Sequence, residues 1–330
     1  MRGAPDPDGQ GGGEGEFDWI ERLLRPLTLG APGALDLLDD AALVRPREGH
    51  DLVVTKDGMV AGVHFLPGDP LDTVAGKLLA VNLSDLAAKG AEPIGYFLSV
   101  AWPRETPWAE KALFAQGLAR AGQDWRLPLL GGDTVSTPGP LTLTATLMGE
   151  VPTGGMILRR TAQVGDLLMV SGPIGDGWLG LQAAQGLLPD PAGVLAARYR
   201  TPTPRLDLIG TFRQFARASA DVSDGLLADA GRIAIASGIG VEVDLDQMPL
   251  SAEGAAWLAE QPDELAARLS LATGGDDYQI VCAVDPAERS ALHAGERGLT
   301  IIGRFKLGDG VTATHNDRLV SLNSLGWTHP

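Results

Sequence analysis

The chain has 330 residues, which is long for one compact core and favours two domains. Its 42 acidic and 26 basic residues give a net charge of −16, which argues against broad attraction to nucleic acid or to an anionic membrane surface. The hydrophobic content of 44% is ordinary for a globular protein and does not indicate a fold class.

The N-terminal segment, residues 1–16, is rich in glycine, proline and aspartate, and we expect a disordered tail. It lacks the basic region followed by an apolar region that defines a signal peptide. No uninterrupted apolar run approaches the roughly 18 residues of a membrane helix. The single cysteine, Cys282, lies in an apolar run and is expected to be a buried strand residue without a disulfide partner. The compartment is therefore expected to be the cytoplasm.

Residues 17–152 alternate between helical and strand patterns. Thr106 resembles an N-cap, with proline at the first position of the helix that follows. We expect helices over residues 17–30, 72–89 and 106–125. We expect strands over residues 52–55, 95–101, 127–130 and 141–147. The third of these strands is expected to stop at Gly131-Gly132-Asp133.

Residues 153–330 show a second mixture of helices and strands, and the boundary between the two parts is expected near residues 152–165. Helices are expected over residues 175–185, 202–216 and 226–238, the last with Gly238 as its C-terminal glycine. Strands are expected over residues 167–170, 241–245, 278–284 and 300–302. This mixture indicates an α/β or α+β protein.

Carboxylates recur where apolar elements end. They follow a strand or a run of small residues at Asp39-Asp40, Asp57, Asp133, Asp221 with Asp224, and Asp276-Asp277. Asp85 differs, because it lies inside an expected helix on the same face as Val74, Leu78 and Val81. Each acid alone is typical of a cap or a turn. Acids that cluster in space repel one another unless cations lie between them, so the recurrence favours a cation site.

The predicted cation is Mg²⁺, because the candidate ligands are oxygens without a local cysteine or histidine cluster. Magnesium is usually held by a few carboxylates and shared with substrate phosphates. Two like unit charges 4 Å apart repel by roughly 4 kcal/mol at an effective dielectric of 20, so several ions are expected if two phosphates meet. The chain has no Walker loop, since Gly76-Lys77 precedes leucine inside an expected helix.

One glycine-rich pattern points to a different class of site. Residues 175–180 match GxGxxG and follow the strand expected at 167–170, as in dinucleotide-binding folds. The second strand that such a fold requires is not found, because the chain continues into Leu188-Pro189-Asp190-Pro191. We therefore expect these glycines to serve helix packing. The alternative, an NAD-dependent dehydrogenase, predicts cofactor binding without magnesium.

Taken together, the ordered motifs resemble the thiamine-monophosphate kinases of the aminoimidazole ribonucleotide synthetase-like superfamily. The resemblance covers about residues 17 to 328 and rests on Gly62 to Leu66, Lys77 to Pro93, Gly131 to Thr134, Asp221 to Leu226 and Gly274 to Tyr278. It implies a two-domain fold, with an N-terminal sheet-forming domain (17–152) for ATP, magnesium and dimerisation and a C-terminal α/β domain (153–330). It also implies a homodimer that transfers the γ-phosphoryl group of ATP directly to thiamine monophosphate, with several Mg²⁺ ions, to give thiamine diphosphate.

The resemblance assigns roles by position. The implied metal ligands are Asp40, Thr55, Asp57, Asp85, Asp133, Asp221 and Asp224. The implied ATP contacts are Gly132, Asp133, Arg159 and Ser223, and the implied thiamine phosphate contacts are His64, Asp276 and Trp327. Asp85, Asp133, Asp221 and Arg159 would take part in catalysis. Because the acceptor is already a phosphate anion, the reaction needs alignment and charge neutralisation rather than a strong base.

Two positions depart from the family pattern. Leu38 stands where glycine is usual, and Lys56 stands where threonine is usual. The lysine puts a metal contact at that position in doubt. We hypothesise that the Lys56 ammonium replaces part of one ion's charge.

Other functions stay open. A hydrogenase-maturation role would need a C-terminal cysteine, and selenophosphate synthesis would need a reactive cysteine or selenocysteine near the N-terminus; the chain has neither. The remaining alternatives are another ATP-using member of the superfamily, such as an aminoimidazole ribonucleotide synthetase, and a non-catalytic magnesium or nucleotide sensor.

Overall fold

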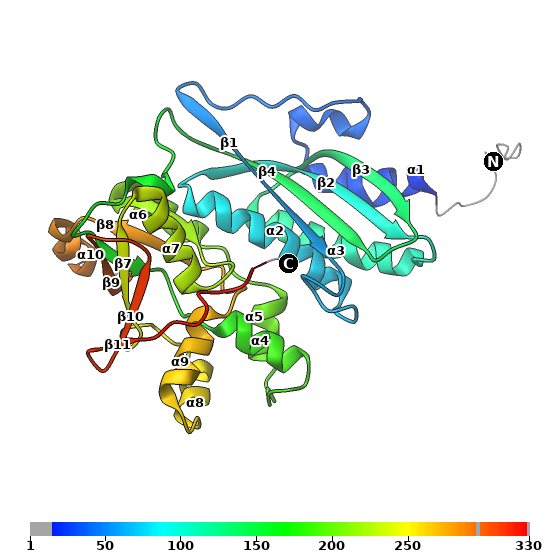
Figure 1. The fold of residues 1–330 in the computed structure, drawn as a ribbon. Coiled ribbons are helices and arrows are strands. Elements are labelled where there is room, and N and C mark those ends of the chain that lie inside the picture. Colours follow the sequence, from blue (N-terminus) through cyan, green and yellow to red (C-terminus); the bar gives the residue numbers. More distant parts are fainter. Residues whose placement is uncertain (1–14, 295–297, 329–330) are drawn as a thin grey trace, which may run out of the picture.

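The computed structural model describes residues 15–294 and 298–328, and within these ranges the chain folds around two β-sheets (Figure 1). A four-stranded sheet in the N-terminal half has the strand order β1-β4-β2-β3. A seven-stranded sheet in the C-terminal half has the order β11-β10-β7-β9-β5-β8-β6. The mixed α/β fold with two parts is confirmed. The residue limits of the two domains stay a prediction, and residues 1–14 of the expected tail lie outside the described residues.

The N-terminal sheet is covered by helices on one face. Its strands are β1 (His50–Val60), β2 (Glu92–Pro103), β3 (Leu129–Thr137) and β4 (Thr142–Pro152). Strands β1 and β2 pair antiparallel to β4, and β3 pairs parallel to β2. The helices α2 (Leu71–Ala88) and α3 (Trp108–Trp125) pack on the same side of this sheet (Figure 1). On the other side, which we call the open face, Val54 is 56% exposed and Val135 is 50% exposed.

The chain enters this half through short helical turns. They are α1 (Glu16–Asp18), a π-helical turn (Trp19–Leu24) and two 3₁₀ turns (Arg25–Thr28 and Pro32–Leu37). The single helix expected over residues 17–30 is therefore divided into three pieces.

The C-terminal half places helices around a longer sheet. Its strands are β5 (Leu167–Val170), β6 (Ala216–Asp221), β7 (Gly240–Asp244), β8 (Ile280–Val284), β9 (Thr300–Lys306), β10 (Val311–His315) and β11 (Arg318–Val320). Its helices are α4 (Asp176–Ala184), α5 (Val194–Arg200), α6 (Ile209–Phe215), α7 (Leu226–Ser237), α8 (Ala252–Ala259), α9 (Glu264–Thr273) and α10 (Arg289–Ala294). Short 3₁₀ turns add Arg159–Thr161, Leu206–Leu208 and Pro286–Glu288. Cys282 lies fully buried in β8, as predicted.

Three predicted elements differ from the structure. Strand β3 does not stop at the glycines but continues through Asp133, because Gly132 pairs with Leu98 so closely that a Cβ there would lie 1.9 Å from the Leu98 carbonyl oxygen. Thr106 is not an N-cap, since its hydroxyl donates to the Pro103 carbonyl oxygen and α3 begins at residue 108. The helix expected over residues 202–216 is shortened to α6 and a 3₁₀ turn, because prolines at 202 and 204 oppose a helix start and residue 216 begins β6.

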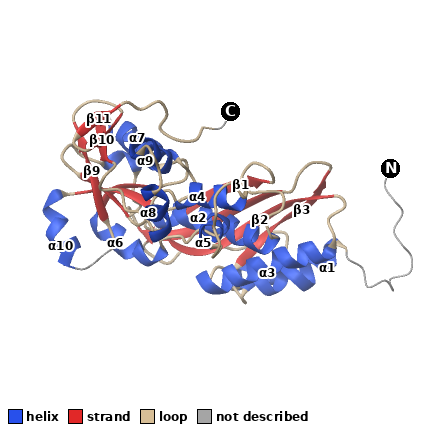
Figure 2. Cartoon of the chain, turned by 90° about the horizontal axis from the view of Figure 1, so that it is seen from below, coloured by secondary structure: helices blue, strands red, loops and turns tan. Residues whose placement is uncertain are grey.

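Helix α2 lies in the middle of the molecule, between the strands of the two sheets (Figure 2). Most of its residues are buried, so it has no solvent-facing polar side. The C-terminal half holds its end: the Ser219 hydroxyl donates to the Ala88 carbonyl oxygen, and Lys89 Nζ donates to the Ser219 carbonyl oxygen at 2.6 Å. No helix in the part of the chain that the structure describes is long and apolar enough to cross a membrane.

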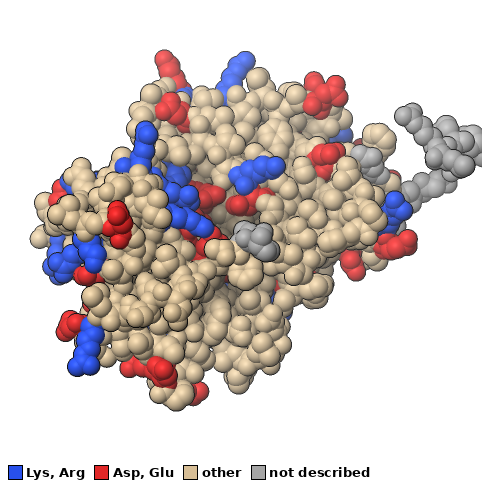
Figure 3. Space-filling view, in the orientation of Figure 1, with Lys and Arg blue, Asp and Glu red and all other residues tan. Residues whose placement is uncertain are grey.

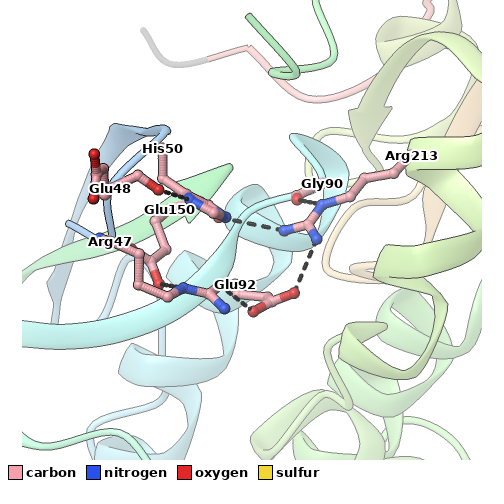
Figure 4. A network of polar contacts seen from close by, with 7 residues as sticks. All are labelled: Arg47, Glu48, His50, Gly90, Glu92, Glu150 and Arg213. Atoms are coloured by element: carbon pink, nitrogen blue, oxygen red, sulfur yellow. Dashed lines mark hydrogen bonds and ion pairs between the residues drawn. The ribbon is translucent and has the colours of Figure 1, made fainter. Parts of the chain in front are cut away.

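A network of charged groups joins the two halves beside this helix end (Figure 4). Arg213 of α6 donates to the Gly90 carbonyl oxygen at 2.5 Å and pairs with Glu92 at 2.9 Å. Arg47 pairs with the same Glu92 at 2.7 Å and with Glu150 at 2.5 Å. Since Glu92 is shared between arginines from both halves, the network fixes how α6 sits against the N-terminal sheet.

Candidate active site

A cavity of about 800 Å³ lies where the two halves meet. Strand β1 and helix α2 line one part of it, and helix α4, the end of α9 and the loops at residues 221–224, 274–278 and 324–327 line the rest. Figure 3 shows acidic and basic side chains side by side around a hollow in this face of the molecule. A volume of this size accommodates two small ligands side by side.

Carboxylates from both halves line this cavity. Alternation along β1 directs Thr55 and Asp57 towards α2, where the Thr55 hydroxyl donates to Asp85 Oδ2 at 2.5 Å. The Asn82 side-chain oxygen accepts the backbone N–H of Asp57 at 3.0 Å. Asp221, which is 5% exposed, enters from the end of β6. The carboxylates of Asp57, Asp85 and Asp221 therefore line one cavity from both sides of the boundary between the halves.

Crowding shifts the proton affinity of these carboxyl groups. Burial, together with the nearby charge of Asp85, raises the pKa of Asp57 to about 6. Burial also raises the pKa of Asp221 well above its usual range, and the charges of Asp85, Asp229 and Asp57 add to the effect. Buried carboxyl groups that raise one another's pKa values mark a site that favours a bound cation.

The donor set fits a hard cation shared with a substrate. Carboxylates and a threonine hydroxyl are the oxygen ligands that Mg²⁺ prefers. Within residues 15–294 and 298–328, however, no three acidic, histidine or cysteine side chains converge closely enough to hold an ion by themselves. A magnesium ion at this place would take its remaining ligands from phosphate oxygens and water.

The loop that carries Ser223 and Asp224 is fixed by a buried carboxylate. Their two backbone N–H groups both donate to Asp229 Oδ2 at 3.0 Å. Arg232 pairs with Asp229 and also with Asp224. The Trp327 N–H donates to the Asp224 carbonyl oxygen at 2.8 Å, which folds the C-terminal segment over the cavity. Asp224 therefore shares its carboxylate with an arginine in this structure.

The predicted acceptor contacts also line the cavity. His64, Asp276 and Trp327 all line it, and the Trp327 side chain is 57% exposed. The residues that sequence reasoning missed are here too: Lys77 Nζ pairs with Asp276 at 2.9 Å, and the Tyr278 hydroxyl donates to Asp276 at 2.9 Å. Lys77 lies eight residues before Asp85 in α2. Because residues four apart lie on nearly the same face of a helix, this spacing could have indicated that Lys77 faces the cavity too.

The glycine-rich segment 175–180 already binds an internal carboxyl group. The backbone N–H groups of Gly175 and Gly177 donate to the Asp277 carboxylate at 2.8 and 2.9 Å. A Cβ at Gly180 would lie 2.2 Å from the Leu195 carbonyl oxygen, so this glycine allows α4 and α5 to approach closely. Strand β5 is antiparallel to both of its neighbours, whereas a dinucleotide fold needs a parallel sheet. These observations support helix packing as the role of the glycines and count against the dehydrogenase hypothesis.

Four predicted site residues do not line the cavity. Thr55 contacts it only through its hydrogen bond to Asp85. Asp40 is exposed in the segment before β1. Gly132 and Asp133 lie on β3, and Asp133 pairs in register with Ser99 on the open face of the sheet. Strands β1 and β3 are separated by two strands, which places them about 14 Å apart. One chain therefore does not bring Asp133 to Asp57, whereas Arg159, Ser223 and Asp224 do line the cavity.

Comparisons with known proteins agree with this arrangement. The family model "AIR synthase related protein, N-terminal domain" matches residues 38–151, and "AIR synthase related protein, C-terminal domain" matches residues 163–316. The thiamine-monophosphate kinase of Caulobacter vibrioides is 57% identical over 318 residues, which cover 95% of this chain and 90% of that protein.

Solved structures give the same result. The thiamine-monophosphate kinase of Stenotrophomonas maltophilia K279a superposes with a TM-score of 0.80 at 39% identity, covering 90% of this chain and 96% of that one. The structure of AaThiL complexed with AMPPCP and TMP superposes with a TM-score of 0.75 at 28% identity, covering 96% of this chain and 97% of that one. The matches span nearly the whole length of each protein. The chain belongs to the thiamine-monophosphate kinase family.

Proposed function

We propose that this chain transfers the γ-phosphoryl group of ATP in one in-line step to thiamine monophosphate, which gives thiamine diphosphate and ADP. The observation that supports it best is that Asp57, Asp85 and Asp221 line one cavity together with His64 and Asp276. AaThiL, which has the same fold, binds the ATP analogue AMPPCP and TMP. An acidic cavity with room for two phosphorylated ligands fits this reaction.

We propose Mg²⁺ as the cation that makes the acidic cavity competent for phosphate. Asp57, Asp85, Asp221 and Asp224 would hold several ions, with Thr55 close by. The ions would neutralise the charge that otherwise keeps two phosphates apart. Arg232, which pairs with Asp224, would have to release that carboxylate before Asp224 can act as a ligand.

The protein groups would align the two substrates. Arg159 and Ser223 would contact the nucleotide, and Trp327 would stack on the thiazolium ring. No side chain has to remove a proton, because a phosphate monoester is already largely ionised at neutral pH. The chain would therefore accelerate the reaction by alignment and charge neutralisation.

A homodimer would explain the residues that lie outside the cavity. The open face presents Leu52, Val54 and Val135, which are apolar and exposed at its two edges. If β3 of a second copy lies beside β1, its Gly132 and Asp133 reach the Asp57 end of the cavity, which one chain cannot achieve. We therefore propose that each nucleotide site draws on both copies. The chain has a net charge of −16, and the reaction needs no basic surface. We therefore expect a cytoplasmic enzyme without nucleic-acid or membrane partners.

An ADP-release assay tests the reaction. Purified protein is incubated with ATP and thiamine monophosphate, with thiamine, or with no acceptor, each with Mg²⁺ and with excess EDTA. We expect ADP and thiamine diphosphate only with thiamine monophosphate and Mg²⁺. ADP release without an acceptor would indicate an ATPase, nucleotide binding without turnover would indicate a sensor, and turnover in EDTA would reject magnesium.

A further inference from the structure

Helix α2 buries a lysine at the acceptor end of the cavity. The Lys77 side chain is only 3% exposed, and the residue is one of those that line the cavity. Its Nζ lies 2.9 Å from Asp276 Oδ2 and 3.3 Å from the His64 carbonyl oxygen. The ring of Tyr199 lies under the same nitrogen, with its centroid at 3.8 Å. A buried ammonium is tolerated only with such partners.

These contacts leave little of the ammonium for a substrate. Lys77 has three N–H donors, and two of them are directed at the oxygens of Asp276 and His64. The third side faces the ring of Tyr199, where a cation–π contact replaces a hydrogen bond. Lys77 therefore binds protein groups rather than a phosphate of its own.

The carboxylate that Lys77 holds stands on strained backbone. Asp276 has φ +67° and Tyr278 has φ +51°. These values lie in the left-handed region, which residues other than glycine rarely adopt. The N–H of Asp276 donates to the Ser223 carbonyl oxygen at 2.9 Å, and the N–H of Tyr278 donates to the Val222 carbonyl oxygen at 2.8 Å. This turn directs Asp276 into the cavity and its neighbour Asp277 away from it, towards α4. Strain of this kind persists where surrounding contacts enforce it.

Both oxygens of Asp276 are thus occupied, one by Lys77 and the other by the Tyr278 hydroxyl. The pairing removes a net negative charge from the place where an anionic acceptor must enter. It also ties the His64 segment of the N-terminal half to the Asp276 turn of the C-terminal half. These are the two segments that the proposed function assigns to the acceptor.

We infer that Lys77 is the positioning residue for the acceptor: its buried ammonium holds Asp276 and the His64 segment at a fixed separation and cancels the charge of Asp276. The inference rests on the proposed function. Lys77 touches neither ATP nor the reacting atoms, so its loss weakens acceptor binding and leaves nucleotide binding intact.

The test compares Lys77→Met with the wild-type enzyme. We expect the KM for thiamine monophosphate to rise about 10- to 100-fold, because Asp276 and the His64 segment lose the group that holds them, while the KM for ATP changes less than about twofold. Calorimetric titration of thiamine monophosphate in the presence of a non-hydrolysable ATP analogue and Mg²⁺ should show the same loss of affinity. Lys306→Met is the matched control. Lys306 lies on strand β9, does not line the cavity and pairs with Glu242 of β7 at 3.1 Å.

A double-mutant cycle separates positioning from general damage. In Lys77→Met/Asp276→Asn neither partner is charged, and we expect it to bind the acceptor no more weakly than the worse single variant. Lys77→Arg, which keeps the charge, should restore part of the affinity. Because the double variant carries no unpaired buried charge, it stays informative even if Lys77→Met folds poorly.

Two results would overturn the role of Lys77. One is an unchanged KM for the acceptor in Lys77→Met; the other is an equal loss of affinity for ATP and acceptor together with strictly additive losses in the cycle. A wild-type protein that does not phosphorylate thiamine monophosphate would instead count against the proposed function, and the two failures are therefore distinguishable.

Discussion

Two groups of acidic residues lie in the N-terminal half, and one chain uses them differently. Asp57 and Asp85 face each other across β1 and α2, inside the cavity, where Asp221 of the other half joins them. Asp133 lies on β3, two strands away from β1, and faces the open side of the sheet. All of these residues are aspartates with small residues nearby in the sequence. Their position in the sheet decides what each can reach.

This difference indicates what each group needs. Asp85 lies on α2, which both halves hold, and the backbone of Asp57 is bonded to Asn82 of the same helix, so a single chain brings these carboxylates to the cavity. The segment around Ala34 covers the part of the open face near Leu130 and Met148. Val54 and Val135, at the edges of this face, stay exposed and need a partner surface. A second copy is the partner that would cover the face and bring Asp133 into use.

The largest expected effect is on the cavity group. Asp85→Asn removes the charge that lies between β1 and β6, and we expect turnover to fall by about 1,000-fold or more because the charge on the transferring group is no longer compensated. Circular dichroism should show an unchanged fold. Asp72→Asn is the matched control, because Asp72 lies in the same helix and pairs with Arg120 outside the cavity. Retained activity in Asp85→Asn would reject its role.

The second prediction concerns the open-face group. Asp133→Asn alone should lower turnover about 100-fold if the residue serves a neighbouring copy. Co-expression of Asp85→Asn and Asp133→Asn chains, with different affinity tags, should then restore activity. Each mixed dimer would contain one site with both native residues, so random pairing restores about a quarter of the wild-type activity.

The mixing experiment discriminates between the two arrangements. If each chain used its own Asp133, every site in a mixed dimer would lack one aspartate and no activity would return. Recovery in the purified mixed dimer therefore supports a shared site. Absence of recovery would contradict it, provided that both tags are found in one complex.

Local patterns allowed much of the fold to be predicted. The periodicity of α2 and the glycine that ends α7 depend on neighbours within a few residues, so they could be recognised in the sequence. The continuation of β3 through its glycines could not, because it depends on the Leu98 backbone of another strand. Strand β6 was missed for a related reason, since its small residues reveal a strand only beside β8.

The candidate site shows the same limit. The positions of Asp57, Asp85 and Asp221 in the cavity agree with the sequence expectation, whereas the absence of Asp133 from it could not be foreseen from motif order. Lys77 was overlooked because its partner Asp276 is 199 residues away in the sequence. The sequence shows which groups are present; distances between remote segments decide which of them meet.

The third prediction concerns the effect of Asp57 on the free energy of unfolding. The pKa of Asp57 is raised to about 6 from 3.8, so the folded state holds this proton more tightly than the unfolded state. The resulting stabilisation is present below about pH 4 and is lost as the pH rises through about 6. In EDTA at pH 7.5, Asp57→Asn should therefore be more stable than the wild type by about 1–2 kcal/mol, after allowance for partial exposure.

Urea unfolding between pH 4 and pH 8 checks this sign. The gain in Asp57→Asn should grow from pH 4 to pH 6 and then stay constant. Asp309→Asn, at an exposed turn, should change the free energy of unfolding by less than about 0.5 kcal/mol. If Asp57→Asn were less stable than the wild type at pH 7.5, the ionised Asp57 would not lower the free energy of unfolding and the prediction would be wrong.

The smallest expected effect concerns Lys56, whose side chain alternates with those of Thr55 and Asp57 along β1 and so lies on the open face. Within one chain, the Lys56 side chain therefore points away from α2 and cannot replace an ion near Asp85. It shares the open face with Asp133, at the opposite edge of the sheet, and the two would meet only between copies. Lys56→Thr should raise the Mg²⁺ concentration for half-maximal activity about two- to fivefold, the range of an exposed ion pair. An unchanged magnesium titration would reject the hypothesis for this lysine and, alongside recovery in the mixed dimer, would leave Asp133 as the sole contribution of the open face.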